Sequence, residues 1–271
     1  MKKVLLLDGY NLMYRARYSG MNKGNYSAVF NFFRGIRPLV EKFNPDICYF
    51  VLEGKPVDRL TVSPDYKGQR VYNNNDNFNE QRKIIIDLIK KYIPFIVVRH
   101  ANYECDDIIN YLANEKHCHD KTVIVSSDTD FIQSINENNS LYNPVSKKFI
   151  EPVGYDYVSW KALVGDKSDN IAGFKGIGNK RAIDLLNNEE KLSNFLLQEN
   201  NQELFDKNMF MISFHSIAEK EDITWSKPAT VNWNDIKSSF EKMEFKSMTS
   251  DKSWKKYTNT FVNLERNLYN V

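Results

Sequence analysis

Four short stretches of the chain are almost continuously apolar, and polar side chains follow each of them. They read KVLLLD at residues 3–8, ICYFVL at 47–52, PFIVVR at 94–99 and KTVIVSS at 121–127. Runs of this length without polar alternation are typical of strands that are buried on both faces of a sheet. The pattern therefore predicts four core strands.

Helical patterns separate these strands. Apolar residues recur three or four positions apart in SAVFNFFRGIRPLVEKF at 27–43, in residues 80–93 and in residues 104–116. Alternation of strands and helices predicts an α/β fold, with a mostly parallel central sheet and helices on both faces. In such folds, ligands bind beyond the carboxyl ends of the strands.

The character of the chain changes near Gly165. After this glycine, strand patterns largely disappear and helical patterns dominate, as at residues 203–219 and 232–244. We therefore expect two units, an α/β core at residues 1–164 and a helical region at residues 165–271.

Residues 66–79 break the regular alternation. They read YKGQRVYNNNDNFN, which is polar, rich in Asn and without periodicity. From residue 66 to residue 91, six lysines and arginines stand against three acidic residues. Two interpretations fit this charge equally well, a surface that faces a polyanion and a solvated helix face. A long insertion in a compact core is usually either functional or disordered.

Carboxylates follow every predicted strand. Because ligand sites of parallel sheets lie at the carboxyl ends of the strands, these side chains are expected to converge at one edge. A single acidic residue after a strand is an ordinary helix cap, so the prediction rests on the whole set. A further pair, in LVGDKSDN, is three positions apart and therefore shares one face of a helical turn. The set is Asp8, Glu53, Glu104, Asp106, Asp128, Asp130, Asp166 and Asp169.

Such a set needs cations. Two unit charges about 4 Å apart repel by ~4 kcal/mol at an effective dielectric of about 20, so converging carboxylates must take up protons or bind metal. The set offers oxygens without His or Cys, which suits Mg²⁺ or Mn²⁺. It exceeds the needs of one ion, and two ions sharing carboxylates are the established arrangement for phosphodiester cleavage. The alternative, Ca²⁺ storage, would require the contiguous acidic loop of an EF-hand, which the sequence lacks.

The segment GFKGIGNKRAIDLL, at residues 173–186, combines two glycines with a basic helix start. Gly176 and Gly178 permit a tight turn with exposed backbone N–H groups, and Lys180 and Arg181 follow. The segment resembles a helix-hairpin-helix element, which holds phosphates through backbone amides and reads no bases. A plain helix–helix turn is the alternative.

Composition adds a few limits. With 271 residues, 42% hydrophobic and 27% charged, and a formal net charge of +2, the sequence is typical of a soluble globular protein. Its apolar runs fall far short of the roughly 20 residues that span a bilayer. The start, MKKVLLLD, is predicted to be a strand and not a signal peptide, so we expect a cytoplasmic protein. Three cysteines without C-x-x-C spacing argue against a disulfide framework and against a zinc site.

Five motifs, in their order and spacing, resemble one family. They are LLLDGYNLMYR, YKGQR, YECDDII, SSDTDF and GDKSDNIAGFKGIGNKRAIDLL. Together they are similar to the 5′ nucleases, in particular to stand-alone flap endonucleases and 5′-to-3′ exonucleases of the phage and bacterial branch. The resemblance covers about residues 3–190. It implies a PIN-like nuclease core, a helical arch at about 66–93 and a helix-three-turn-helix motif at 173–186.

The resemblance also implies an activity. The protein would be a Mg²⁺-dependent enzyme, with Mn²⁺ able to substitute, that hydrolyses phosphodiesters of branched or 5′-ended DNA near the junction of single strand and duplex. Removal of RNA primers from RNA:DNA hybrids, as ribonuclease H activity, is a further expectation. The protein would act as a monomer in DNA replication and repair, in the host cytoplasm if it is phage-encoded.

Metal ligands carry over from the family by position. Asp8, Glu104, Asp106 and Asp128 are similar to the ligands of a first metal group. Asp130, Asp166 and Asp169 are similar to those of a second group, so the stretch SSDTDF would bridge the two.

DNA contacts carry over in the same way. Lys67 and Arg70, at the start of the arch, would steer and polarise the scissile phosphate, and the Asn-rich part of the arch would be mobile without DNA. The hairpin carbonyls would bind K⁺. The expected DNA-binding set is Tyr66, Lys67, Arg70, Lys175, Gly176, Ile177, Gly178, Lys180 and Arg181.

Glu53 departs from the family pattern. Many relatives place an aspartate shortly after this strand, whereas VLEGKP has a glutamate one residue nearer to Arg59, and only its longer side chain offsets the shift. The departure leaves open a second function, a catalytically impaired protein that binds DNA junctions. A third alternative, a small RNA-cleaving toxin nuclease, shares an acidic α/β core but lacks the hairpin segment. For Lys252, Lys255 and Lys256 two interpretations are open, contact with duplex DNA and plain surface, and we favour plain surface.

Overall fold

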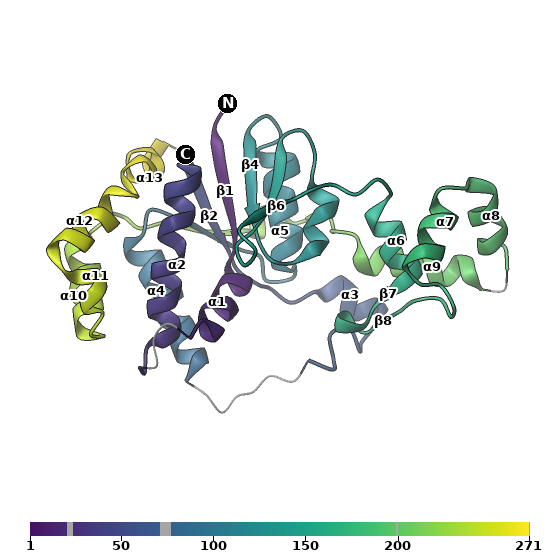
Figure 1. The fold of residues 1–271 in the computed structure, drawn as a ribbon, viewed down its shortest axis with the longest axis horizontal. Coiled ribbons are helices and arrows are strands. Elements are labelled where there is room, and N and C mark those ends of the chain that lie inside the picture. Colours follow the sequence, from purple (N-terminus) through teal and green to yellow (C-terminus); the bar gives the residue numbers. More distant parts are fainter. Residues whose placement is uncertain (21–23, 71–76, 199, 271) are drawn as a thin grey trace.

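A computed structural model describes residues 1–20, 24–70, 77–198 and 200–270. Within these ranges a seven-stranded sheet forms the centre of the molecule, in the order β6-β5-β4-β1-β2-β3-β9 (Figure 1). The strands are β1 Lys3–Asp8, β2 Ile47–Val51, β3 Ile96–Arg99, β4 Lys121–Val125, β5 Asn139–Asn143, β6 Lys148–Ile150 and β9 Thr224–Ser226. Strands β1 to β5 are parallel, and β6 and β9 form antiparallel edges. The predicted mostly parallel sheet and its four core strands are confirmed.

Helices cover both faces of the sheet because successive strand residues point to opposite sides. Leu5 and Leu7 of β1 pack with α1 (Gly9–Tyr18), α2 (Ser27–Phe43) and α4 (Phe78–Tyr92). Val4 and Leu6 pack instead with α5 (Cys105–Tyr111) and the π-helical turn that continues it, Leu112–Lys116. The carboxyl ends of β1 to β5 are thereby held in one rigid edge.

A smaller helical lobe lies beside this edge. Its elements are α6 Tyr157–Val164, β7 Gly165–Asp166, a 3₁₀ turn at Lys167–Asp169, β8 Ile171–Ala172, α7 Asn179–Leu186, α8 Glu189–Leu196 and α9 Asn201–Ile212. They bury a core of their own around Ala162, Ala182 and Met211. Helix α3 (Val57–Val62) packs against α9 and joins the lobe to the sheet.

The chain after residue 213 returns to the sheet. A 3₁₀ turn at Lys220–Asp222 precedes β9, which pairs with β3. Helices α10 Trp233–Lys242, α11 Lys246–Thr249, α12 Asp251–Asn259 and α13 Val262–Asn267 then pack on the α2 and α4 side through an aromatic cluster. A last turn at Leu268–Asn270 follows, and its Leu268 is buried in the core on the α5 side. The predicted helical region 165–271 thus divides, and its second half covers the core. Lys252, Lys255 and Lys256 are exposed around the buried Trp254, as expected of surface lysines.

The expected helical arch is only partly helical in the described residues. Residues 64–69 form turns, and the next described helix is α4, whose Phe78, Ile85 and Ile89 are buried in the sheet's core. Helix α4 is therefore a core helix. The Asn-rich segment, for which mobility is predicted, falls mainly on residues 71–76, outside the described residues. In the ranges that the structure covers, no helix is long and apolar enough to cross a membrane.

Candidate metal and nucleic-acid site

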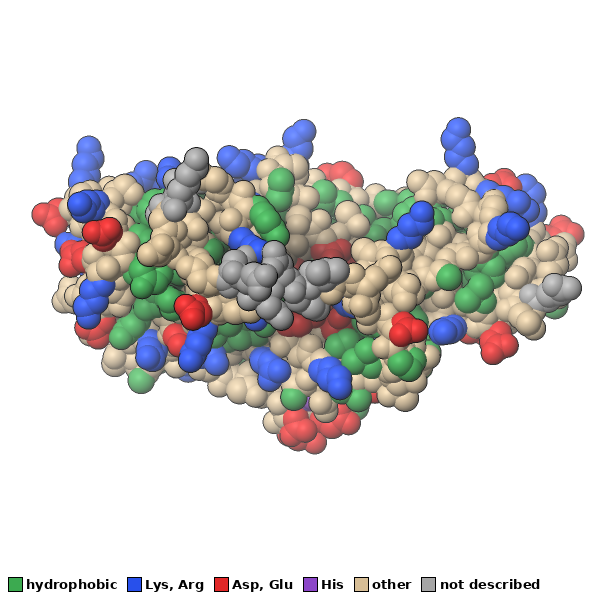
Figure 2. Space-filling view, turned by 90° about the horizontal axis from the view of Figure 1, so that it is seen from below, with side chains coloured by type: hydrophobic (Ala, Val, Ile, Leu, Met, Phe, Trp, Pro, Cys, Tyr) green, Lys and Arg blue, Asp and Glu red, His purple; other side chains and the backbone are tan. Residues whose placement is uncertain are grey.

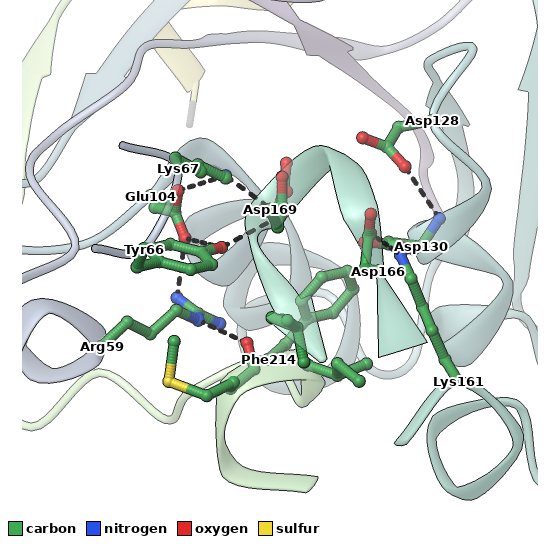
Figure 3. Close-up of a pocket in the computed structure, with 14 residues that line it drawn as sticks. Arg59, Tyr66, Lys67, Glu104, Asp128, Asp130, Lys161, Asp166, Asp169 and Phe214 are labelled. Carbon is green, nitrogen blue, oxygen red and sulfur yellow. Dashed lines mark hydrogen bonds and ion pairs between the residues drawn. The ribbon is translucent and has the colours of Figure 1, made fainter. Parts of the chain in front are cut away.

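The predicted carboxylates meet at the carboxyl edge of the sheet. Asp8 ends β1, Glu53 follows β2, Glu104 and Asp106 begin α5 after β3, and Asp128 follows β4. Asp130 follows Asp128 in the turn after β4, and Asp166 and Asp169 approach from the smaller lobe. Six of the eight carboxylates line one small pocket with Lys67 and Lys161 (Figure 3). Asp8 and Glu53 lie just beyond it, close enough for their charges to raise the pKa of Asp106.

Asp8 is buried and held from three sides. Its carboxylate accepts hydrogen bonds from the Asn11 N–H at 3.0 Å and from Ser126 Oγ at 2.7 Å, and Cys105 Sγ lies 3.7 Å away. Burial raises the pKa of Asp8 to about 6 although these bonds act against the shift. The side chain is therefore fixed in position while its negative charge is only partly compensated.

The carboxyl groups of Glu53 and Asp106, which neighbour Asp8, also have raised pKa values. Burial, followed by the charge of Glu104, raises the pKa of Glu53 to about 7. Burial and the charge of Asp128 raise the pKa of Asp106 well above its ordinary value. Glu53 also accepts the Cys105 N–H at 3.2 Å, so its longer side chain does reach the start of α5.

A second group forms where the smaller lobe faces the sheet. Asp130, Asp166 and Asp169 each present a carboxylate oxygen within 4.8 Å of the others. The Lys161 ammonium lies between two of them, donating to Asp130 and pairing with Asp166 at 2.6 Å. Burial raises the pKa of Asp130, while for Asp166 the bonds from Lys161 and Ser168 outweigh burial and lower the pKa.

A pair of glycines gives this second group its geometry. Gly165 has a φ of +84°, and a Cβ on it would lie 2.3 Å from the backbone nitrogen of Gly173. On Gly173, a Cβ would lie 2.0 Å from the Val164 carbonyl oxygen. Since side chains are excluded at both positions, the chain can pack closely where β7 and β8 pair, and the turn between these strands presents Asp166 and Asp169 together.

The YKGQR segment packs over the carboxylates. Lys67 donates to Glu104 at 2.5 Å and lies 3.7 Å from Asp169, and Arg70 pairs with Asp169 at 2.5 Å. The Tyr66 hydroxyl donates to Glu104 at 3.1 Å, and its ring is buried, so in this conformation the tyrosine faces the carboxylates. Lys67 has a φ of +55°, uncommon for a residue with a side chain, and its N–H is held by the Asp169 carbonyl at 3.1 Å.

Arg59 also belongs to the site, although it was not among the site residues predicted from the sequence. Its buried guanidinium forms a two-point pair with Asp107, at 2.8 and 2.9 Å, and also reaches Glu104 at 3.0 Å. It further donates to the carbonyls of Met211 and Ser213. Arg59 thus ties α3, α5 and the end of α9 together directly beneath Glu104. Asp107 is fully buried against Arg59, so we assign it a structural role.

The donor set fits hard divalent cations. The pocket is lined by carboxylate oxygens without His or Cys, which matches the preference of Mg²⁺ and Mn²⁺. Burial, and to a smaller extent neighbouring carboxylates, raises the pKa values of Asp8, Glu53 and Asp106, and bound cations would stabilise their charged forms. In this conformation the side chains of Lys67, Arg70 and Lys161 supply part of the positive charge that the carboxylates need.

Stability without divalent ions should fall as the pH rises. The pKa values of Asp8 and Glu53 are raised by folding, so each favours the folded state below pH 4 and loses that contribution as the pH rises through about 6 and about 7. We expect the melting temperature in EDTA to decrease between pH 5 and pH 8, and Mn²⁺ to stabilise most at pH 8. A melting temperature in EDTA that increases over this range would contradict the assignment.

Lys161 should compete with a divalent ion. The Lys161 ammonium pairs with both Asp130 and Asp166. Replacing Lys161 with Met therefore removes this partner from both carboxylates when no metal is bound, and it leaves both free to bind a metal ion. We expect Lys161→Met to melt at a lower temperature in EDTA and to gain more from Mn²⁺ than the unmodified protein. Lys191→Met is the matched control, since Lys191 pairs with Asp184 on an exposed surface. Equal gains in both variants would contradict this role of Lys161.

The hairpin predicted at residues 173–186 forms a tight, exposed turn. Gly176 has a φ of +78°, and α7 begins directly after Gly178. Lys175, Gly176, Gly178, Lys180 and Arg181 are exposed, whereas the Ile177 side chain is buried and anchors the turn in the lobe. Of this predicted set, Ile177 can therefore offer only its backbone to a ligand.

Seen from below in Figure 2, acidic side chains lie recessed near the middle of the face, between the core and the smaller lobe. Lys and Arg side chains stand on the protruding parts to either side. The face therefore combines a recessed acidic centre with a periphery on which Lys and Arg side chains stand among acidic ones.

Comparison with known proteins places the sequence among nucleases. Residues 3–161 match the family model described as "5′-3′ exonuclease, N-terminal resolvase-like domain". A 5′-3′ exonuclease of Aquifex aeolicus is 32% identical over 257 residues, covering 87% of this chain and 83% of that protein. DNA polymerase I of Lactococcus lactis subsp. cremoris is 31% identical over 262 residues, but the match covers 85% of this chain and only 28% of the polymerase.

Solved structures share the fold. The flap endonuclease of bacteriophage T5, in a pseudo-enzyme-product complex with DNA and metal ions, superimposes with a TM-score of 0.64 at 22% identity. The superposition covers 78% of this chain and 89% of that protein. At this identity the likeness concerns the fold alone.

Proposed function

The chain belongs to the 5′-3′ exonuclease family, and on that premise we propose that it is a structure-specific 5′ nuclease. It would hydrolyse phosphodiesters near the junction of single-stranded and duplex DNA, as a flap endonuclease and as a 5′-to-3′ exonuclease. The observation that carries the proposal is the convergence of eight carboxylates, from the ends of four strands and from the smaller lobe, at one edge of the sheet, where six of them line a single pocket. An acidic centre flanked by basic side chains suits a polyanion cut at a metal site.

We propose Mg²⁺ as the cofactor, with Mn²⁺ able to substitute. Asp8, Glu104, Asp106 and Asp128, with Glu53 beside them, would hold one ion, and Asp130, Asp166 and Asp169 the other. Bound there, the ions would supply an activated water and stabilise the leaving oxygen of the phosphodiester.

The protein's own side chains have three tasks in this proposal. Ser126 and Asn11 fix the Asp8 carboxylate, and Arg59 fixes Glu104, so that the ligands are oriented before substrate arrives. Lys67 and Arg70 lie over the carboxylates, from which position their charges can turn to an incoming phosphate. The exposed turn around Gly176 would hold duplex phosphates through backbone N–H groups.

The test compares three substrates with labelled 5′ strands: a DNA flap, a blunt DNA duplex and an RNA:DNA hybrid. With Mg²⁺ or Mn²⁺ at low salt, we expect the flap to be cut close to the junction and the duplex to be degraded from its 5′ end. Cleavage of the hybrid would add primer removal to the activity. A flap that is bound but stays intact in both metals would favour the alternative, a catalytically impaired junction-binding protein.

Binding of the flap should weaken steeply with salt, because phosphate contacts release condensed counterions. For a footprint of about six contacts, the affinity measured in Ca²⁺ or EDTA should fall roughly 10³-fold between 50 and 200 mM salt. Replacing both Lys180 and Arg181 with Gln should reduce the slope by about two, and replacing Lys191 and Lys207, whose side chains are also exposed, provides a control of equal charge. A slope that is flat in the unmodified protein would contradict the proposed hairpin contact.

A further inference from the structure

A second cavity lies on the α1 and α2 side of the sheet. It is bounded by α1, by the length of α2 and by the hairpin that joins β5 to β6, and its volume is about 340 Å³. Ligand pockets in proteins typically begin at roughly 300 Å³. None of the residues that line this cavity belongs to the carboxylate pocket.

The cavity has a single sign of charge. Of the residues that line it, Arg15, Arg34, Lys42 and Lys147 are basic, and none is Asp or Glu. Within the described part of the chain the Arg15 guanidinium has neither a hydrogen bond nor an ion pair, and burial lowers its pKa. A half-buried cation without a counterion is stabilised by an anionic ligand.

The floor of the cavity is apolar but contains two polar atoms that lack partners among the described residues. Asn31 is 7% exposed and donates to the Ala16 carbonyl, which leaves its Oδ1 without a hydrogen bond. Ser19 Oγ is buried and unpaired as well. Both atoms are closed off from solvent in this conformation, so a ligand in the cavity reaches them only if the Ser19 or Asn31 side chain rotates. Because unpaired buried polar atoms are costly, a rotation that pairs them with a hydrogen-bond donor of the ligand would be favoured.

Gly35 keeps the cavity open. It lies in the middle of α2, where glycine costs roughly 1 kcal/mol relative to alanine. A Cβ at this position would meet only Arg15 Nη1, at 3.9 Å, so the packing of the helix does not require a glycine. A larger side chain would instead extend into the space in front of Arg15.

We propose that this cavity binds one nucleotide unit, with its phosphate at Arg15 and Arg34 and its base against the apolar floor. The chemistry required is an anion joined to a flat, largely apolar group that carries N–H or O–H donors. A mononucleotide has all of these, and so does a single nucleotide of a DNA strand. The cavity would be a binding site outside the carboxylate centre, and the inference does not depend on cleavage.

The test measures binding to the full chain in EDTA by calorimetry, with 5′-dAMP, a 5′-phosphorylated thymidine tetranucleotide and inorganic phosphate as probes. Gly35→Leu, which fills the cavity, and the double variant Arg15→Gln/Arg34→Gln should each weaken binding at least 10-fold. Gly35→Ala should bind like the unmodified protein and melt at the same or a higher temperature. Arg37→Gln is the charge control, because Arg37 lies on α2 but pairs with Glu41 and does not line the cavity.

Variant-sensitive binding of 5′-dAMP supports the proposal and indicates a free nucleotide as the occupant. Variant-sensitive binding of the tetranucleotide alone supports it too and indicates a nucleotide within a strand. The proposal is overturned if inorganic phosphate binds as tightly as either nucleotide probe, or if Gly35→Leu and the arginine variant bind both nucleotide probes as the unmodified protein does.

Discussion

Replacing Asp128 with Asn is expected to lower the rate of flap cleavage on the order of 10³-fold while leaving flap binding intact. Asp128 lines the carboxylate pocket, and its charge raises the pKa values of Asp106 and Asp130. Loss of one preorganised electrostatic group at a reaction centre costs about this much. Its Oδ1 also accepts the Asp130 N–H at 2.9 Å, a bond that an amide oxygen can retain, so the local fold should survive.

Single-turnover cleavage and binding in Ca²⁺ measure the two effects separately. Asp222→Asn, at an exposed carboxylate far along the chain, should change neither. DNA binding by Asp128→Asn should be equal or slightly tighter, because a negative charge facing the phosphates is removed. Cleavage by Asp128→Asn within 10-fold of the unmodified rate would contradict the role assigned to Asp128.

Replacing Arg59 with Met is expected to lower the free energy of unfolding by about 3–5 kcal/mol, the usual cost of leaving buried charges without a partner. Asp107 would lose a two-point ion pair and Glu104 a third contact, and the carbonyls of Met211 and Ser213 would lose their donor. Urea denaturation monitored by circular dichroism gives this difference.

Arg59→Lys is the matched variant. It keeps the charge but cannot donate along both edges of Asp107 at once, so an intermediate loss is expected. Arg37→Met, which breaks a partly exposed pair on α2, should cost less than about 1 kcal/mol. A loss for Arg59→Met as small as that of Arg37→Met would show that the buried network does not hold the lobe to the sheet.

The core of the fold could be predicted because its signals are local. The continuous apolar runs of β1 to β4 and the apolar face of α2 are legible within single windows of sequence, and each lies where the pattern indicates. The edge strands were missed because NSLYN, KFI and TWS are short, and outer positions such as Phe149 and Trp225 are exposed rather than buried. The helix predicted at 203–219 ends at Ile212, since the chain beyond it is drawn onto Arg59 and Asp107.

The residues of the site also divide into those that have a local signal in the sequence and those that do not. The eight carboxylates were identified because each follows a strand or stands in a compact motif, and the structure brings them to one edge. Their roles as metal ligands stay a prediction. Lys161 and Arg59 were not identified because each meets its partners through tertiary packing, Arg59 and Asp107 being 48 positions apart in the chain. A basic residue inside a helix gives no signal of its own that a carboxylate from another element will face it.

The most direct test of the central claim is anomalous diffraction from crystals soaked in Mn²⁺. We expect two peaks, one within coordination distance of Asp8, Glu104, Asp106 or Asp128 and the other within that distance of Asp130, Asp166 or Asp169, with Lys161 displaced from the second group. The absence of any peak among these carboxylates, in crystals of a protein that cuts the flap in Mn²⁺, would contradict it.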